Sequence, residues 1–304
     1  MGTVALIPLN PPAPDTLARR TTWNASAVLK MWHLASLDAP TVAVTWAWAF
    51  GWAAGVRPPA RPLVVLALAV WVIYVADRLL DARAGLAGAS LHLLQARHFF
   101  HWRNRRILIP LCVCAAATAG WMVLTRMPAM GLRIGSVVGL ATLAYLSNVH
   151  GANESGGWMR RMKNRLPRLL PRECVVGVVF SAGCLLPVMA RTRFHWNLAV
   201  AAIAFAALAW LNVNIIGAWE GCRAKRPRTR RGAIVLACAC LVLAAVLAGA
   251  QPGTAEVVLA AGVSALLLAA LDTMAETMEP VVLRAAADLV LLTPLLVLAA
   301  RGPA

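Results

Sequence analysis

The sequence predicts an all-α, polytopic membrane protein with about nine transmembrane helices. Apolar stretches recur along all 304 residues, of which 61% are hydrophobic, and the mean hydropathy is +0.71. A helix needs about 20 residues to cross the hydrocarbon core of a bilayer, and most of these stretches are about that long. The basic residues are concentrated in the connections between them. Both observations are typical of a chain that crosses a membrane repeatedly.

The predicted elements follow one another along the chain. Residues 1–32 contain four prolines and no long apolar run, so we expect a disordered cytosolic segment rather than a cleaved signal. Residues 33–304 are predicted to form a single transmembrane helical domain, because no connection is long enough for a soluble one. The predicted spans are 34–56, 62–82, 107–125, 130–149, 173–190, 196–219, 233–250, 254–275 and 282–300.

Three connections carry most of the positive charge. Residues 83–106, 150–172 and 220–232 each contain at least five lysines or arginines, and the alternate connections contain at most two. Loops rich in these residues stay on the cytoplasmic side, so we expect these three loops and the N-terminus there, in a bacterial inner membrane. The net charge of +17 is therefore explained by topology and does not indicate nucleic-acid binding. We expect no protein partner, and we interpret the seven scattered cysteines as small apolar residues.

A pair of carboxylates marks the end of the second predicted span. Asp77 and Asp81 are four residues apart, so they lie on one face of a helix. A hard divalent cation such as Mg²⁺ would relieve their mutual repulsion and leave coordination sites for phosphate oxygens. The alternative is a pair of interfacial carboxylates that Arg78 and Arg83 neutralise.

These features resemble the UbiA-type intramembrane prenyltransferases. That family has nine helices in a bundle, an N-x-x-x-D-x-x-x-D motif at the cytoplasmic end of helix 2 and a second acidic motif at the end of helix 6. Asp77 and Asp81 match the aspartates of the first motif, and Ile73 replaces its asparagine. The stretch RLPRLLPRECVVGVVFSAG (165–183) is similar to the family's basic lead into helix 5. The resemblance implies that Arg168 and Arg172, with Arg78, bind the substrate phosphates.

The second acidic motif is degenerate in this chain. The stretch LNVNIIGAWEGC (211–222) offers Asn212, Asn214 and Glu220 where the family has aspartates. The resemblance implies that Glu220 is a metal ligand and that the two asparagines bind substrate. Alternatively, the asparagines form hydrogen bonds between helices, and Glu220 forms a surface ion pair with Arg223 or Lys225.

Other charged groups near the same side of the membrane have alternative interpretations. Asp272, Glu276 and Glu279 share a helix face. They either complete a second metal site or form the polar face of an amphipathic helix end that is solvated by water at the lipid head groups. Asp288 lies four residues after Arg284, which predicts a salt bridge. Residues 90–106 are expected to form an interfacial helix, whose arginines Arg97, Arg103 and Arg105 would help to hold a diphosphate if it caps the site.

The resemblance implies a membrane enzyme that uses a prenyl diphosphate and Mg²⁺ at the cytoplasmic face. Asp77 and Asp81 would be the catalytic, metal-binding pair, and the prenyl group would pass to an acceptor that the sequence does not identify. Two other classes compete with this interpretation. One is a non-catalytic or terpene-cyclase-like member of the superfamily, and the other is a membrane transporter or lipid-binding protein.

Overall fold

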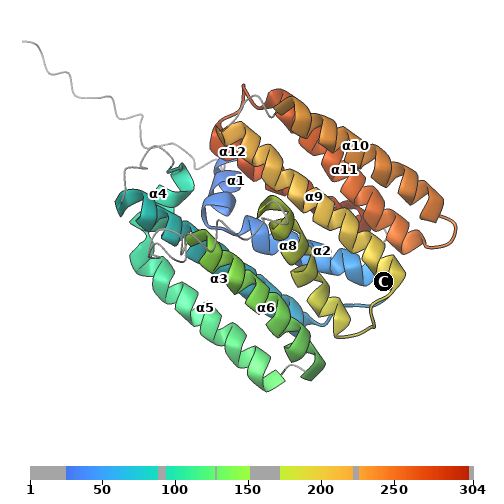
Figure 1. The fold of residues 1–304 in the computed structure, drawn as a ribbon, viewed down its shortest axis with the longest axis horizontal. Helices are drawn as coiled ribbons and strands as arrows, with labels where there is room; N and C mark the ends of the chain where they lie inside the picture. Colours follow the sequence, from blue (N-terminus) through green and yellow to red (C-terminus); the bar gives the residue numbers. More distant parts are fainter. Residues whose placement is uncertain (1–24, 88–93, 127–128, 151–171, 222–225, 301–304) are drawn as a thin grey trace, which may run out of the picture.

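The computed structural model describes residues 25–87, 94–126, 129–150, 172–221 and 226–300, and the regular structure in these ranges is helical (Figure 1). The first half contains α1 (Ala25–Leu34), α2 (Asp38–Ala53), α3 (Ala60–Ala87), α4 (Ala96–Arg103), α5 (Arg105–Arg126) and α6 (Ala129–His150). The second half contains α8 (Arg172–Met189), α9 (Trp196–Gly221), α10 (Arg226–Leu247), α11 (Pro252–Met274), α12 (Pro280–Leu289), the 3₁₀ helix η4 (Val290–Leu292) and α13 (Pro294–Ala300). The all-α prediction is confirmed for these ranges.

Six segments within the described residues are long and apolar enough to cross a membrane. They are Ala60–Leu86, Arg105–Thr125, Trp196–Gly221, Arg226–Leu247, Pro252–Met274 and Pro280–Val297. Gly131–Ala144 and Glu173–Met189 are shorter apolar helices, and α2 has 16 residues. A multi-pass membrane protein is therefore supported, whereas nine crossings and a UbiA-like arrangement stay predictions.

The helix α2 lies at the centre of the bundle. It packs against α3, α8, α9 and α11, and α10 and α11 form an antiparallel pair at one edge (Figure 1). The Trp46 ring stacks on the Phe205 ring of α9 with centroids 4.1 Å apart, and its indole N–H donates to the Leu291 carbonyl at 2.8 Å. This buried core holds α2 between α9 and the C-terminal segment, so side chains at the start of α2 are fixed in position.

The N-terminal part of the structure differs from the prediction. Residues 25–32 belong to α1 and not to a disordered lead-in, and residues 1–24 lie outside the described ranges. The predicted first span, 34–56, is interrupted because a short turn separates α1 from α2. Ser36 in this turn has φ of +58°, a left-handed conformation that few non-glycine residues adopt. The turn changes the direction of the chain between α1 and α2, and α1 packs against α12 and α4.

Candidate functional site

An apolar cavity of about 660 Å³ lies between α3, α6 and α8. A stripe of α3 residues spaced three or four apart lines one wall, as expected for one helix face: Pro62, Val65, Leu66, Ala69, Val70, Ile73, Tyr74 and Asp77. From Pro62 to Asp77 the stripe spans 15 residue steps (77 − 62), or about 22 Å at 1.5 Å per step. The cavity therefore follows most of the apolar length of α3 and has a carboxylate at one end. Ile73, which the predicted resemblance aligns with an asparagine, contributes to the apolar wall.

Asp81 lies one helical turn beyond Asp77, on the same side of α3. Its Oδ2 is 3.8 Å from Nε2 of His98 on α4. The Gln95 backbone N–H donates to Nδ1 of His98 at 3.0 Å, so the ring proton of the neutral form sits on Nε2 and faces Asp81. Burial, followed by the charges of Arg97 and Arg78, lowers the pKa of His98 to about 4. The neutral ring therefore adds no positive charge beside Asp81.

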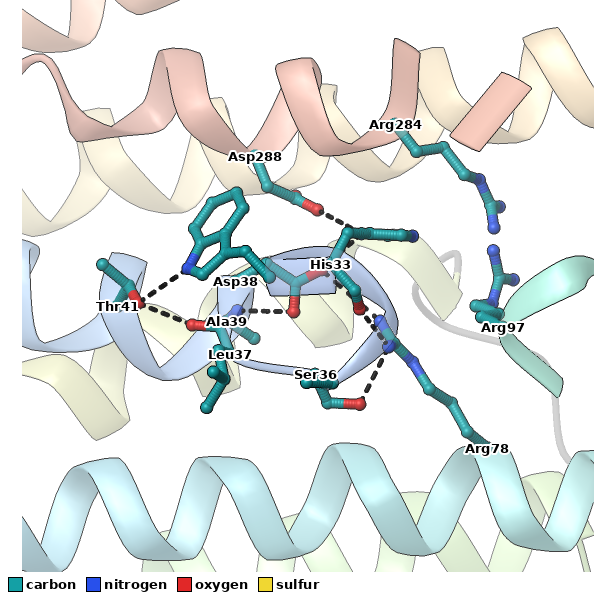
Figure 2. A network of polar contacts seen from close by, with 12 residues as sticks. His33, Ser36, Leu37, Asp38, Ala39, Thr41, Arg78, Arg97, Arg284 and Asp288 are labelled. Atoms are coloured by element: carbon teal, nitrogen blue, oxygen red, sulfur yellow. Dashed lines mark hydrogen bonds and ion pairs between the residues drawn. The ribbon is translucent and has the colours of Figure 1, made fainter. Parts of the chain in front are cut away.

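The α1–α2 turn brings a second group of polar residues together (Figure 2). His33 and Asp38, on either side of the turn, are 95% and fully buried. Nδ1 of His33 lies 2.6 Å from Oδ2 of Asp38 and 3.6 Å from Oδ2 of Asp288 on α12. The amide of Asn212 on α9 donates to Oδ1 of Asp288 at 3.1 Å. This cluster therefore joins α1, α2, α9 and α12.

Arg78 of α3 supplies positive charge to the same cluster. Its Nη1 donates to the His33 carbonyl and to Oγ of Ser36, both at 2.8 Å, and its Nη2 is 3.5 Å from Oδ2 of Asp38. Arg78 is 94% buried, so these contacts satisfy a guanidinium that water does not reach. Its donors are used inside the protein, which argues against the phosphate contact that the sequence suggests for it.

A directed chain of hydrogen bonds links this arginine to α4. Nδ1 of His101 lies 2.8 Å from the Arg97 carbonyl, and a carbonyl only accepts, so Nδ1 carries the proton. Nε2 of His101 then accepts from Oγ of Ser36 at 3.0 Å, while Ser36 accepts from Arg78. Burial is the main reason that the pKa of His101 falls to about 4. A neutral His101 fits this bonding pattern, which fixes α4 against the turn.

The charges of His33, Asp38, Asp288 and Arg78 sum to zero when His33 is protonated. Burial alone would lower the pKa of His33, but the hydrogen bonds and charges of Asp288 and Asp38 raise it above its ordinary value. The donor atoms of His33, Asp38 and Asp288 lie within 4.8 Å of one another, a spacing that a metal ion accepts. Because Arg78, together with His33 when it is protonated, balances both carboxylates, we interpret this cluster as an internal ion network.

The remaining predicted residues have separate environments. Asn212 is 93% buried and bonded to Asp288, as expected for a hydrogen bond between helices. The amide of Asn214 donates to the carbonyl of Trp210 in its own helix at 2.8 Å. Neither asparagine is among the residues that line the cavity, where α9 contributes Val213. The structure thus favours structural roles for both asparagines over the predicted contact with substrate.

Glu220 is held by arginines from two other helices. It contacts Arg284 of α12, and its Oε1 lies 3.4 Å from Nη1 of Arg97 on α4. The predicted ion pair between Arg284 and Asp288 is therefore wrong, because Asp288 instead contacts His33 and Asn212. The metal-ligand role suggested for Glu220 competes with these two ion pairs.

Arg226 on α10 neutralises the acidic residues at the end of α11. Its Nε lies 3.3 Å from Asp272, which also accepts from the Trp219 indole at 2.8 Å, and its Nη1 lies 3.0 Å from Glu276. These contacts tie together α9, α10 and α11, so they favour a structural role for both acids over a second metal site.

Two of the predicted phosphate-binding arginines, Arg168 and Arg172, give no further information on the site. Arg168 lies outside the described residues, as do Arg223 and Lys225, the alternative ion-pair partners predicted for Glu220. Arg172 is the first residue of α8, and its side chain is not described.

The sequence prediction missed His33, Ser36 and Asp38. The stretch WHLASLD (32–38) places a histidine and an aspartate just before an apolar run, which was the available signal. The turn at Ser36 that brings them together has no glycine or proline to announce it. Arg78 was noticed, but its partners on α1 and α2 could not be known from its neighbours on α3.

A search with this chain found no matching family model, no matching curated protein and no matching solved structure. The resemblance to the prenyltransferase superfamily therefore depends on the residues described above.

Proposed function

We propose that the protein is an intramembrane prenyltransferase that binds a prenyl diphosphate with its tail in the α3–α6–α8 cavity. The observation that carries this proposal is the shape and chemistry of that cavity: an apolar wall about 22 Å long that ends at a carboxylate. A long hydrocarbon chain with an anionic head is the kind of ligand that such a cavity fits. Its lining includes few polar side chains, among them Tyr74, Asp77, Ser136 and Thr142.

The acidic pair fits Mg²⁺ by the chemistry of its donors. Asp77 and Asp81 offer hard carboxylate oxygens on one face of α3, and the neutral His98 adds no positive charge beside Asp81. When bound, Mg²⁺ would supply charge stabilisation for the departing diphosphate. The distribution of basic residues among the loops predicts that this end of α3 lies on the cytoplasmic side, where the soluble part of the substrate would enter.

The reaction breaks the bond between the allylic carbon and the diphosphate oxygen. The diphosphate leaves with the electron pair, and the acceptor's nucleophilic atom forms the new bond to carbon and releases a proton. The residues of this chain would orient the head group at Asp77 and Asp81. The apolar wall would exclude water from the allylic cation, which water would otherwise capture.

The test is release of diphosphate from a radiolabelled prenyl diphosphate by the purified full chain. We expect release with Mg²⁺ and none with a chelator. Asp77→Asn should lose this release. Glu256→Gln is its matched control, because Glu256 accepts from the Trp52 indole at 2.7 Å and lies near the start of α11, away from the acidic pair. Absence of Mg²⁺-dependent release across a panel of prenyl chain lengths would contradict the proposal.

A lipid-binding protein without transferase activity is the second candidate. It is favoured by the second motif, where arginines from two other helices hold Glu220, the one carboxylate of that motif, so that a second metal ion would compete with these ion pairs. Binding of the labelled prenyl diphosphate without release of diphosphate would select this candidate.

A further inference from the structure

Two arginines face one another between α4, α9 and α12. Figure 2 shows the side chains of Arg97 and Arg284 extended toward each other from α4 and α12. Glu220 of α9 contacts both. Two positive charges thus share one carboxylate, which leaves an excess of one positive charge at this place.

The donors of Arg284 are not used up by this contact. Arg284 is 93% buried, and its Nε and Nη1 have no hydrogen-bond partner among the described residues. These two nitrogens carry three of the five N–H groups of a guanidinium. A buried charged donor without a partner is costly, because the folded protein has removed it from water without replacing the lost hydrogen bonds.

The neighbouring acids do not supply the missing partner. Asp288, four residues after Arg284, contacts His33 and Asn212 instead. Asp38 contacts His33 and Arg78. The charge of Arg97 is also poorly compensated. Burial, followed by the charge of Arg78, lowers the pKa of Arg97 to about 10, although the charges of Asp81 and Asp77 oppose this effect. The surroundings of Arg97 and Arg284 therefore favour an additional anion.

We propose that Arg97 and Arg284 form a binding site for a phosphoryl anion. A planar guanidinium presents two parallel N–H groups that match two oxygens of a phosphate, and two opposed guanidiniums enclose such a group from both sides. The side chains of Arg97 and Glu220 are 20% and 26% exposed, so the cluster borders solvent at these two residues, whereas the unpartnered nitrogens of Arg284 lie behind them. The phosphoryl group belongs either to a soluble phosphate compound or to a lipid head group.

This proposal does not rest on prenyl transfer, since its evidence is the donor excess at Arg284. The proposal also predicts the direction in which anion affinity changes when Glu220 is replaced. Glu220 contacts Nη2 of Arg284 and Nη1 of Arg97, and its negative charge repels an anion bound beside them, so its removal strengthens binding, whereas removal of either arginine weakens it. A purely structural ion pair predicts no anion dependence at all.

The experiment measures the Tm of the purified full chain in a chelator-containing buffer during titration with pyrophosphate. Binding to the folded state raises the Tm. We expect Arg284→Gln and Arg97→Gln to bind at least about tenfold more weakly than the wild type, the factor that corresponds to about 1.4 kcal/mol. We expect Glu220→Gln to bind more tightly. Arg226→Gln is the matched control, because Arg226 already contacts Asp272 and Glu276.

A second arm uses vesicles of phosphatidylcholine with and without phosphatidate. Stabilisation by pyrophosphate alone identifies a soluble phosphate compound, and stabilisation by phosphatidate alone identifies a lipid head group; both support the site. No response of the wild type to either probe overturns the proposal. An unchanged response in Arg97→Gln, or weaker binding in Glu220→Gln, also overturns it, and these two variants decide the question if Arg284→Gln does not fold.

Discussion

Two neighbouring residues of α3 face different environments. Asp77 lines the apolar cavity between α3, α6 and α8, whereas Arg78 reaches the buried ion network formed by His33, Ser36 and Asp38. Successive residues of a helix point about 100° apart, so one turn can serve both sides. The comparison separates a charged residue that lines the cavity from a charged residue that contacts the buried ion network.

The largest expected effect is a loss of stability when Arg78, the α3 residue that contacts the buried ion network, is replaced. Arg78→Gln would leave Asp38 without its guanidinium partner in a fully buried position. Removal of one member of a buried ion pair costs about 3–5 kcal/mol, because the remaining charge is uncompensated. We expect a large loss of stability in thermal unfolding of the detergent-solubilised protein, with little folded protein recovered. A Tm equal to that of the wild type would show that the network does not stabilise α1 and α2.

A substitution on the cavity side of α3 should impair activity and leave stability almost unchanged. Asp77→Asn keeps the size of the side chain and removes a proposed metal ligand, so we expect Mg²⁺-dependent diphosphate release to fall by about 10²–10³-fold, the loss typical of a removed charge-stabilising group. The Tm should change little, because Asp77 lies at the cavity wall. If Asp77→Asn instead lowers the Tm and leaves turnover normal, Asp77 belongs with Arg78 as a structural residue.

The apolar part of the cavity permits a sharper test. Gly139 of α6 lines the cavity, and a Cβ added there meets no atom within 4 Å. Gly139→Leu would fill part of the space, and we expect the KM for a prenyl diphosphate to rise by about tenfold, or about 1.4 kcal/mol. Gly120→Leu on α5 is the control, since its Cβ is equally unobstructed and it does not line the cavity. Equal kinetics in both variants would exclude this cavity as the tail site.

The sequence predicted which α3 residues share the cavity face better than it predicted the contacts of the buried ion network. The four-residue spacing of Asp77 and Asp81 is a local property, and helix periodicity determines that both share the face that includes Ile73. The partners of Asp288 are not local. Spacing favoured Arg284 on the same helix, but packing of α1 against α12 brings His33 to Asp288 and leaves Arg284 to Glu220. Hydropathy also located the helices, but it carried no information on the turn at Ser36 that forms the network.

The smallest expected effect is a pH dependence that separates His33 from His101. The pKa of His33 is raised in the folded state, so its contribution to stability is complete below pH 6.5 and is lost as the pH rises through the folded-state pKa. The pKa of His101 is lowered to about 4, so its contribution is complete above pH 6.5 and is lost as the pH falls toward 4. In Tm measurements across this range, we expect His33→Gln to weaken the decline above pH 6.5, by a few degrees. His101→Gln should weaken only the decline below pH 6.5. An identical alkaline decline in the wild type and His33→Gln would mean that His33 is not the cation between Asp38 and Asp288, and the charge balance of the network would then require a different proton.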